Sequence, residues 1–254
     1  MAERLLQGLP ASPGEAAGRA RRLDPEIAAA GPPLPEVERP AALAAARTAL
    51  AAAGEELQAL GSRLRAEGRE GDAEIVETGV LMAADPALDA ALEAAVLTDG
   101  RPPTVALAAA CGVHAGLIAA LPDATLAARA DDVRSLGRRA ARAFLPSGTS
   151  VPAEGTQVPP GAAILVADDL GPADVAELDA SVAGIALAGG GPSAHAAVVA
   201  RGLGMPLVVG LGPELLALRD GAQLALDGEA GTLAVEPDAA RFAAAVAALT
   251  STRT

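Results

Sequence analysis

The 254-residue chain contains one cysteine, two phenylalanines, and neither tryptophan nor tyrosine. The single cysteine, Cys111, excludes an internal disulfide framework and a zinc site built from cysteines. The scarcity of aromatic side chains removes the platforms on which nucleic-acid bases stack. Lysine is absent, so 19 arginines face 32 acidic residues and the net charge is −13. We therefore expect no nucleic-acid partner.

Apolar segments suited to a membrane are also missing. Residues 1–10 lack the apolar core of a signal peptide. Two uncharged stretches, residues 104–121 and 181–200, have the length of a bilayer span, but they are rich in alanine and glycine, which contribute little to insertion. We expect a cytoplasmic protein without a membrane partner.

The apolar content of 51% is sufficient for a sizeable core, and the length allows one large domain or two small ones. The sequence pattern favours two. Residues 1–22 are short and turn-rich, which predicts one strand or two, bent at Pro13-Gly14. Residues 37–145 are alanine-rich and helical in pattern. After Pro146, short apolar runs alternate with helical segments.

Leucines at near-heptad spacing predict an amphipathic helix that ends near Glu67. They are Leu43, Leu50, Leu57, Leu60 and Leu64. Further helices are predicted over residues 73–83, 87–97, 103–121 and 124–145, separated by connectors rich in Gly, Asp and Pro. Because these connectors are short, the helices should pack as an antiparallel bundle.

The C-terminal part is predicted to be α/β. Strands are expected over residues 163–166, 182–187, 207–209, 224–226 and 232–235, and helices over residues 172–178, 196–203 and 237–249. The turn formers at residues 227–231 predict a hairpin. A strand near residue 8 should join this sheet. The predicted fold class is thus α/β plus all-α: a β/α domain of residues 1–30 and 146–254 with an inserted antiparallel helical bundle of residues 31–145.

Candidate chemistry concentrates in the stretch from Gly189 to His195, which follows a predicted strand and opens a predicted helix. Glycines let the backbone approach an anion, and a helix N-terminus offers unpaired N–H groups. Ser193 is the predicted N-cap, and Gly202 and Gly204 suit the helix end. A neutral imidazole at His195 can accept a phosphoryl group. The same residues also fit a tight turn with a capping or core histidine, or a dinucleotide-binding loop.

The segment GGPSAHAAVVARGLGMPLVVG, from Gly190 to Gly210, resembles the signature of the phosphohistidine swivelling domain of phosphoenolpyruvate-utilising enzymes. The match has no gap. Residues 6–14 resemble the opening of Enzyme I of the bacterial phosphotransferase system, and residues 81–88 and 129–139 resemble its helical domain. Residues 166–172 resemble the turn that precedes the phosphohistidine strand of that family.

The resemblance implies a swivelling phosphohistidine domain that relays phosphate between phosphoenolpyruvate and the small phosphocarrier protein HPr. It implies that His195 is phosphorylated on the ring nitrogen farther from the backbone. The phosphate-binding residues would be Gly190, Gly191, Ser193 and Arg201, and the HPr-binding residues Leu81, Met82, Ile118, Leu126 and Arg129. The four apolar residues could instead belong to the core of the bundle. Arg129 could instead pair with Asp131 or Asp132 on its own helix. Arg201 could instead pair with the acidic surface.

Three positions depart from the family's pattern. Ala194 stands where the family has a serine beside the histidine, and Pro192 where Enzyme I often has arginine. Val175 aligns with a threonine that can bond the histidine ring in Enzyme I. These departures support an alternative function, a degenerate and non-catalytic module that docks an HPr-like protein.

Enzyme I continues into a barrel domain that binds phosphoenolpyruvate and Mg²⁺, whereas this sequence ends at Thr254. We therefore expect no cofactor and no metal on this chain, and a phosphotransferase that does not use phosphoenolpyruvate on its own. The expected partner is an HPr-like phosphocarrier. A separate phosphoenolpyruvate-binding domain or a dihydroxyacetone kinase relay are further alternatives, since multiphosphoryl transfer proteins can lack the barrel. Swivelling would place hinges near residues 22–35 and 145–160.

Two further pairs of residues carry alternatives. His114 and Cys111 could form a metal or redox pair, but a partly buried bundle histidine is favoured because no carboxylate lies nearby in the sequence. Asp168 and Asp169 resemble turn and capping residues, with a role in orienting the phosphate site as the alternative.

Overall fold

A computed structural model of the chain describes residues 3–23, 32–127, 129–144 and 163–252. The chain forms two compact units. One contains residues 1–25, 150–170 and 174–254, and the other contains residues 26–149 and 171–173. The domain boundaries predicted at residues 30 and 146 lie outside the described residues, as do the predicted hinge near residues 145–160 and most of the one near residues 22–35.

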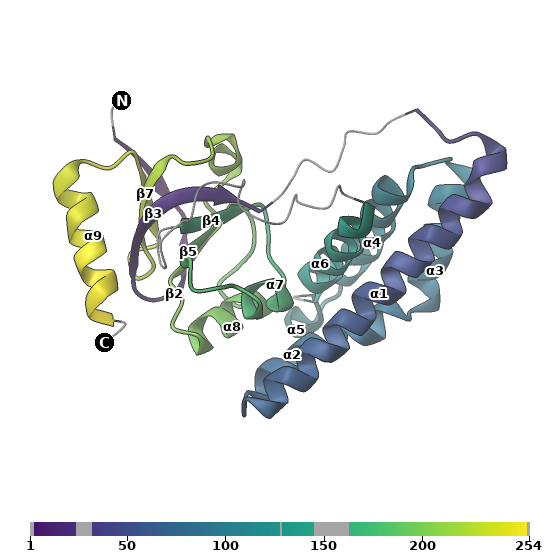
Figure 1. Cartoon of the computed structure of the whole chain (residues 1–254), viewed down its shortest axis with the longest axis horizontal. Coiled ribbons are helices and arrows are strands. Elements are labelled where there is room, and N and C mark those ends of the chain that lie inside the picture. The colour runs from purple at the N-terminus through teal and green to yellow at the C-terminus, as the bar shows by residue number, and fades with distance from the viewer. Residues whose placement is uncertain (1–2, 24–31, 128, 145–162, 253–254) are drawn as a thin grey trace. The chain divides into compact units, whose positions relative to one another are not determined.

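The described strands of the first unit form one mixed sheet (Figure 1). They are β1 (Arg4–Gln7), β2 (Leu9–Ser12), β3 (Glu15–Arg22), β4 (Ala163–Ala167), β5 (Val182–Leu187), β6 (Leu207–Val209), β7 (Gln223–Asp227) and β8 (Thr232–Val235). Their order across the sheet is β1-β8-β7-β3-β4-β5-β6-β2. Neighbours from β3 to β6 run parallel and the other neighbours run antiparallel. The strands predicted after Pro146 and the hairpin between β7 and β8 are confirmed.

The N-terminal segment forms three strands, so the prediction of one strand or two was wrong. Gly8 separates β1, which pairs with β8, from β2, which pairs with β6 at the opposite end of the sheet. A Cβ atom at Gly8 would lie 2.4 Å from the backbone oxygen of Val209, so this crossing requires glycine. The bend at Pro13-Gly14 is confirmed, and Gly14 has a φ of +114°. One short segment therefore joins both edges of the sheet, which confirms that the strand near residue 8 belongs to it.

Both faces of the sheet are covered. Ile164 of β4 packs on one face with Leu6 of β1 and with Leu215 of the 3₁₀ turn Pro213–Ala217. Leu165, the next residue, packs on the other face against α7 (Pro172–Ala176) and α8 (His195–Gly202). The C-terminal helix α9 (Ala239–Thr252) places Phe242 against alanines of β3, β7 and β8. Successive side chains of a strand thus pack on opposite faces of the sheet, and both faces are buried.

The second unit is the predicted helical bundle. Its helices are α1 (Arg39–Ala66), α2 (Glu70–Ala83), α3 (Pro86–Glu93), α4 (Pro103–Ala119), α5 (Ala124–Ala127) and α6 (Ala130–Ala141), with a π-helical extension Ala94–Thr98 after α3. The five predicted core leucines of α1 are all buried. Asp85 caps α3 by accepting a hydrogen bond from the N–H of Ala87 at 2.8 Å, and Gly68 and Gly100 take positive φ values after α1 and after the π-helical segment.

The last bundle helix is interrupted, which corrects the prediction of one helix over residues 124–145. Leu126 N–H donates to the Asp123 carboxylate at 3.1 Å, so the short α5 has its own start. Asp131 and Asp132 then lie in the first turn of α6, where the partial positive charge of a helix N-terminus stabilises carboxylates. The capped start of α5 and the acidic first turn of α6 therefore favour two separate helices. Leu145, the predicted end, lies outside the described residues.

Helices α4 and α6 approach closely at Gly137. A Cβ atom there would lie 2.8 Å from both the Cβ and the Sγ atoms of Cys111. Burial raises the pKa of the Cys111 thiol to about 12, so the reactive thiolate is not populated at neutral pH. Cys111 is therefore a small packing residue of this helix pair.

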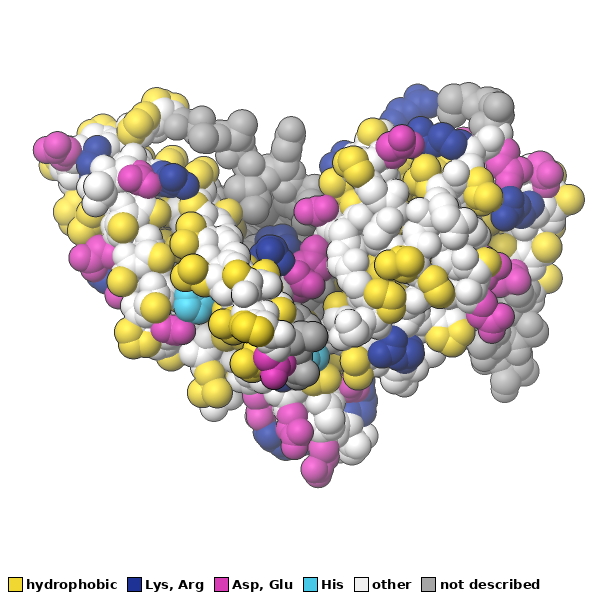
Figure 2. All heavy atoms as spheres, turned by 180° about the vertical axis from the view of Figure 1, so that it is seen from behind, with side chains coloured by type: hydrophobic (Ala, Val, Ile, Leu, Met, Phe, Trp, Pro, Cys, Tyr) yellow, Lys and Arg dark blue, Asp and Glu magenta, His cyan; other side chains and the backbone are white. Residues whose placement is uncertain are grey.

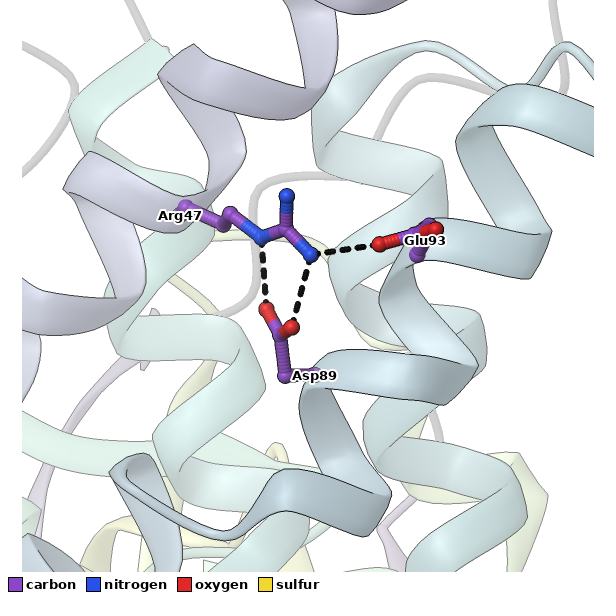
Figure 3. A network of polar contacts seen from close by, with 3 residues as sticks. All are labelled: Arg47, Asp89 and Glu93. Atoms are coloured by element: carbon purple, nitrogen blue, oxygen red, sulfur yellow. Dashed lines mark hydrogen bonds and ion pairs between the residues drawn. The ribbon is translucent and has the colours of Figure 1, made fainter.

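An exposed ion-pair network joins α1 to α3 (Figure 3). Arg47 Nε and Nη2 donate to the two carboxylate oxygens of Asp89, each at 2.7 Å, and Nη2 also donates to Glu93 at 2.6 Å. The bidentate geometry matches the planar guanidinium to the carboxylate. The hydrogen bond from Arg47 holds the pKa of the Asp89 carboxyl below its usual range.

We predict that Arg47→Met lowers the free energy of unfolding at neutral pH, because Asp89 loses the cation that stabilises its charged form. A lowered folded-state pKa adds stability above the unfolded value of about 4, and that contribution is lost as the pH falls through the folded value. The gap between variant and wild type should therefore be constant above about pH 5 and close as the pH falls below 4. Urea unfolding followed by circular dichroism measures it, since the chain has no tryptophan or tyrosine.

Arg101→Met is the matched control. Arg101 is also exposed and pairs with Asp99, two residues away, at 3.2 Å, so this contact joins no two helices. An equal loss of stability in both variants, or a gap that persists at pH 3, would contradict the role assigned to Arg47.

Candidate functional site

The glycine-rich loop lies where three parallel strands end. β4, β5 and β6 all point their carboxyl ends to the same edge of the sheet, and the loop of residues 188–194 follows β5 there. Gly189 N–H donates to the backbone oxygen of Asp168, just after β4, at 2.8 Å. Gly210 N–H, just after β6, donates to the backbone oxygen of Gly189 at 2.9 Å. The sheet edge therefore anchors the start of the loop, at the place where open α/β sheets bind their ligands.

The loop leads directly into α8, and His195 is the first residue of that helix. The N–H groups of Ala197 and Val198 donate to the Ala194 oxygen, so the helix turns immediately after the loop. The N–H groups of residues 195 and 196 have no acceptor inside the helix and point out of its N-terminus. Gly190 takes a φ of +79°, and no atom lies within 4 Å of a Cβ built on Gly191. Backbone donors and open space thus meet beside His195, which suits an anion.

The His195 side chain is partly exposed, and its Nδ1 atom is buried. Nε2 is the ring nitrogen farther from the backbone. The geometry therefore favours reaction at Nε2, the nitrogen that the family resemblance implies.

The N-cap of α8 is Ala194, so the prediction that Ser193 caps this helix was wrong. Ala194 has the extended backbone of a cap, with φ −58° and ψ 148°, and makes no side-chain cap hydrogen bond. Ser193 is exposed and lies one residue too early. The helix begins one residue before the predicted start at residue 196, which moves the cap from the serine to the alanine. At the other end, Gly204 follows α8 with a φ of +63°, as predicted for a helix stop.

Arg201 reaches back from the end of α8 to the loop that precedes the helix. Its Nη1 atom donates to the backbone oxygen of Ala11 at 2.6 Å and to that of Pro192 at 3.2 Å. The described contacts of Arg201 are thus with backbone carbonyls rather than with the acidic surface. Of the other positions that depart from the family's pattern, Pro192 is exposed and Val175 is fully buried in the core under α7 and α8.

The residues predicted to bind HPr lie on the surface of the helical unit. Leu81 is 75% exposed and Leu126 is 52% exposed, so the bundle-core alternative is wrong for both. Met82 and Ile118 are partly exposed and are not among the buried core residues. Arg129 pairs with Asp132 at 3.3 Å, one of the two partners considered from sequence.

Three more exposed apolar residues, in and just after α4, were not predicted from the sequence. Val113 and Leu117 of α4 and Leu121 after it are 62%, 67% and 43% exposed. Figure 2 shows apolar side chains exposed on the helical unit. Because α4 is apolar on nearly every side, its sequence did not show which face would be buried.

A contact between His114 and Asp85 shows that the two parts of this surface lie at the same end of the bundle. His114 Nε2 of α4 lies 3.3 Å from the Asp85 carboxylate, in the turn between α2 and α3. Leu81 precedes Asp85 by one helical turn and Leu117 follows His114 by about one turn, so both flank the pair. No carboxylate lies near His114 in the sequence, and the fold supplies Asp85 from 29 residues away. We refer to Leu81, Met82, Val113, Leu117, Ile118, Leu121 and Leu126 as the apolar surface.

Two kinds of site are not found in the described part of the chain. No three His, Cys, Asp or Glu side chains there come together in a way that could hold a metal ion. No described helix combines the length and the apolar composition needed to cross a bilayer.

Two sequence models of one family match the chain. The N-terminal domain of PEP-utilising enzymes matches residues 7–129, and the mobile domain of PEP-utilising enzymes matches residues 159–231. Together they cover most of the chain, including helices α1 to α5 of the helical unit and the His195 loop. The chain therefore belongs to the PEP-utilising enzyme family.

Within this family the similarity is to Enzyme I and related proteins. The chain is 44% identical to a multiphosphoryl transfer protein of Rhodobacter capsulatus over 144 residues, 55% of this chain and 17% of that protein. It is 28% identical to the phosphoenolpyruvate-protein phosphotransferase of Priestia megaterium over 234 residues, 91% of this chain and 40% of that protein. The chain thus spans less than half the length of these relatives.

Solved structures match nearly the whole chain. The NMR solution structure of an Enzyme I protein (nEIt) has a TM-score of 0.62 and 27% identity, over 98% of this chain and 100% of that one. An N-terminal domain of a nitrogen Enzyme 1 has a TM-score of 0.55 and 25% identity, over 96% and 99%. The family resemblance and the predicted fold class, a phosphohistidine α/β domain with an inserted bundle, are confirmed.

We predict that Ala194→Ser stabilises the protein by about 0.5–2 kcal/mol, the usual effect of a serine hydroxyl at an N-cap. Ser193→Ala is the matched control, and we expect it to leave stability unchanged because Ser193 does not cap the helix. Urea unfolding followed by circular dichroism measures both. If Ser193→Ala destabilised the protein and Ala194→Ser did not stabilise it, the cap would be Ser193 after all.

Proposed function

We propose that this chain is a phosphoryl-transfer protein of the phosphotransferase system that carries phosphate on His195 and exchanges it with the histidine of an HPr-type phosphocarrier. The observation that carries this proposal is the position of His195. It is the first residue of α8, it follows a glycine-rich loop that is anchored at the ends of the parallel strands, and it lies inside the match to the mobile domain.

In the proposed step His195 Nε2 attacks the phosphorus of a phosphohistidine on the phosphocarrier. The phosphorus–nitrogen bond of the donor breaks as the new bond to Nε2 forms, and the donor imidazole leaves. Both bonds are of the same type, so the free-energy change is small and the transfer runs in both directions. Backbone N–H groups of Gly190, Gly191 and Ser193 and of the N-terminus of α8 stabilise the phosphoryl oxygens, and positioning supplies most of the catalysis.

We further propose that the phosphocarrier docks on the apolar surface of the helical unit. The surface exposes several large apolar side chains from α2, α4 and α5, as expected of a protein contact. Asp85, whose N–H donates to the Met82 oxygen at 3.2 Å, and Arg129, whose N–H donates to the Leu126 oxygen at 3.0 Å, supply charge at its rim. No cofactor is proposed for the chain itself, because in complete Enzyme I phosphoenolpyruvate and Mg²⁺ belong to the barrel domain.

Intact mass measurement tests phosphoryl transfer. Wild type and His195→Ala are each incubated with phospho-HPr and, separately, with phosphoenolpyruvate plus Mg²⁺. We expect one phosphoryl adduct on the wild type from phospho-HPr and none on the variant, because Nε2 of His195 is the acceptor. The adduct should be labile in acid and stable in base, as a phosphohistidine is.

An adduct that persists in His195→Ala would refute the assignment of the residue. A stable complex with HPr but no adduct from either donor would refute phosphoryl transfer and establish the docking module instead. An adduct from phosphoenolpyruvate alone would show that the chain needs no separate donor.

We predict that Leu117→Ser slows transfer from phospho-HPr about 10- to 100-fold, through a higher KM with little change in kcat, because a buried interface anchor contributes about 1–3 kcal/mol. Val37→Ser is the matched control. Val37 is 86% exposed and lies in the turn before α1, where Leu34 N–H donates to the Gly100 oxygen just ahead of α4. Leu117 lies near the other end of α4, about 20 Å along the helix from its start. An unchanged KM in Leu117→Ser, or equal effects in both variants, would place the docking site elsewhere.

A further inference from the structure

The two most distinctive motifs of the sequence lie against each other in the α/β unit. The opening motif of residues 6–14 contains β2, and the phosphohistidine motif of residues 190–210 contains β6, and these strands pair in antiparallel register. A Cβ atom at Gly14 would lie 3.0 Å from the ring of Pro206. The opening motif therefore packs against β6, the strand that follows α8.

Arg201 joins the same two motifs a second time. One nitrogen, Nη1, donates to the Ala11 oxygen of β2 at 2.6 Å and to the Pro192 oxygen of the loop at 3.2 Å. A guanidinium Nη atom carries two N–H bonds, so it can serve both carbonyls at once. The hydrogen bonds connect the loop to a strand 180 residues away in the sequence, and the loop residue involved is three residues before His195.

The direction of the Pro192 carbonyl decides what Arg201 can do. In a trans peptide the C=O and the next N–H lie in one plane and point in opposite directions. No cis peptide occurs among the described residues. Holding the Pro192 oxygen on the guanidinium therefore turns the Ser193 N–H to the other side of the loop. A phosphoryl group that uses this N–H lies on the side away from Arg201, since its oxygens are repelled by the Pro192 carbonyl.

Resting on the function proposed above, we propose that Arg201 is a positioning residue that clamps the His195 loop to β2 and sets the direction of its backbone donors, rather than a ligand of the phosphoryl group. Through the Arg201 guanidinium, the loop at Pro192 is held to the Ala11 carbonyl of β2. Loss of the clamp would free the loop without changing the charge at the phosphoryl oxygens.

Arg201→Gln tests the clamp, with Arg19→Gln as the matched control. Arg19 makes the same kind of contact in the same unit, from Nη1 to the backbone oxygen of Gly221 at 3.0 Å, in a different loop. In the unphosphorylated protein we expect amide hydrogen exchange of residues 188–194 to accelerate at least tenfold in Arg201→Gln and not in Arg19→Gln. Circular dichroism confirms that each variant is folded.

Transfer kinetics and ³¹P NMR of the phosphorylated protein distinguish a positioning residue from one that only stabilises the fold. We expect kcat for transfer from phospho-HPr to fall about 10- to 100-fold in Arg201→Gln while KM stays unchanged, because docking uses the helical unit. The ³¹P pH titration of the phosphohistidine should keep its midpoint. A shifted midpoint with unchanged amide exchange would overturn the proposal and make Arg201 a direct ligand.

A second variant covers the case in which Arg201→Gln does not fold. Arg201→Lys keeps the charge, but its nitrogen lies one bond closer to the backbone, so exchange of residues 188–194 should rise to a lesser degree. Exchange equal to wild type together with slower transfer would overturn the clamp. If wild type takes up no phosphate, the proposed function fails, yet the exchange measurement still decides whether Arg201 holds the loop.

Discussion

The structure of the α/β unit depends on the crossing of the N-terminal segment at Gly8. Within nine residues the chain pairs first with β8 and then with β6, the strands next to the two ends of the sheet. A side chain at residue 8 would collide with the backbone of Val209, so the crossing exists only with glycine. Because β2 is held beside β6 in this way, the Ala11 carbonyl comes within reach of Arg201. The loop that carries His195 is thereby connected to the first strands of the chain.

The helical unit is stabilised by a different set of interactions. Its leucine-lined α1 contributes to the apolar core, and polar contacts join its helices, such as the ion pair of Arg47 with Asp89 and the contact of His114 with Asp85. Exposed ion pairs such as Arg47–Asp89 add little stability, so the arrangement of the helices depends mainly on the packing of their apolar faces. This packing leaves the apolar surface uncovered, with Leu81 of α2 and Leu117 of α4 at the end of the bundle where His114 meets Asp85.

Elements with strong local signals could be predicted from the sequence. The leucine spacing of α1, the Pro and Gly breaks between helices, the apolar strands after Pro146 and the turn formers between β7 and β8 are all short-range patterns, and the structure confirms them. Predictions failed where a boundary depends on one residue or on a distant partner. The cap of α8 moved from Ser193 to Ala194, the helix expected over residues 124–145 divided, and the N-terminal segment gained a strand.

The sequence by itself determined the family, the reactive histidine as a candidate and the pattern of helices and strands, since these are written in local spacing and in one ungapped motif. Only the tertiary structure decided which side chains are exposed on α4, which carboxylate meets His114 and where the Arg201 guanidinium points. These are contacts between residues far apart along the chain. Their formation depends on how strands and helices pack, and no local pattern of residue types specifies that.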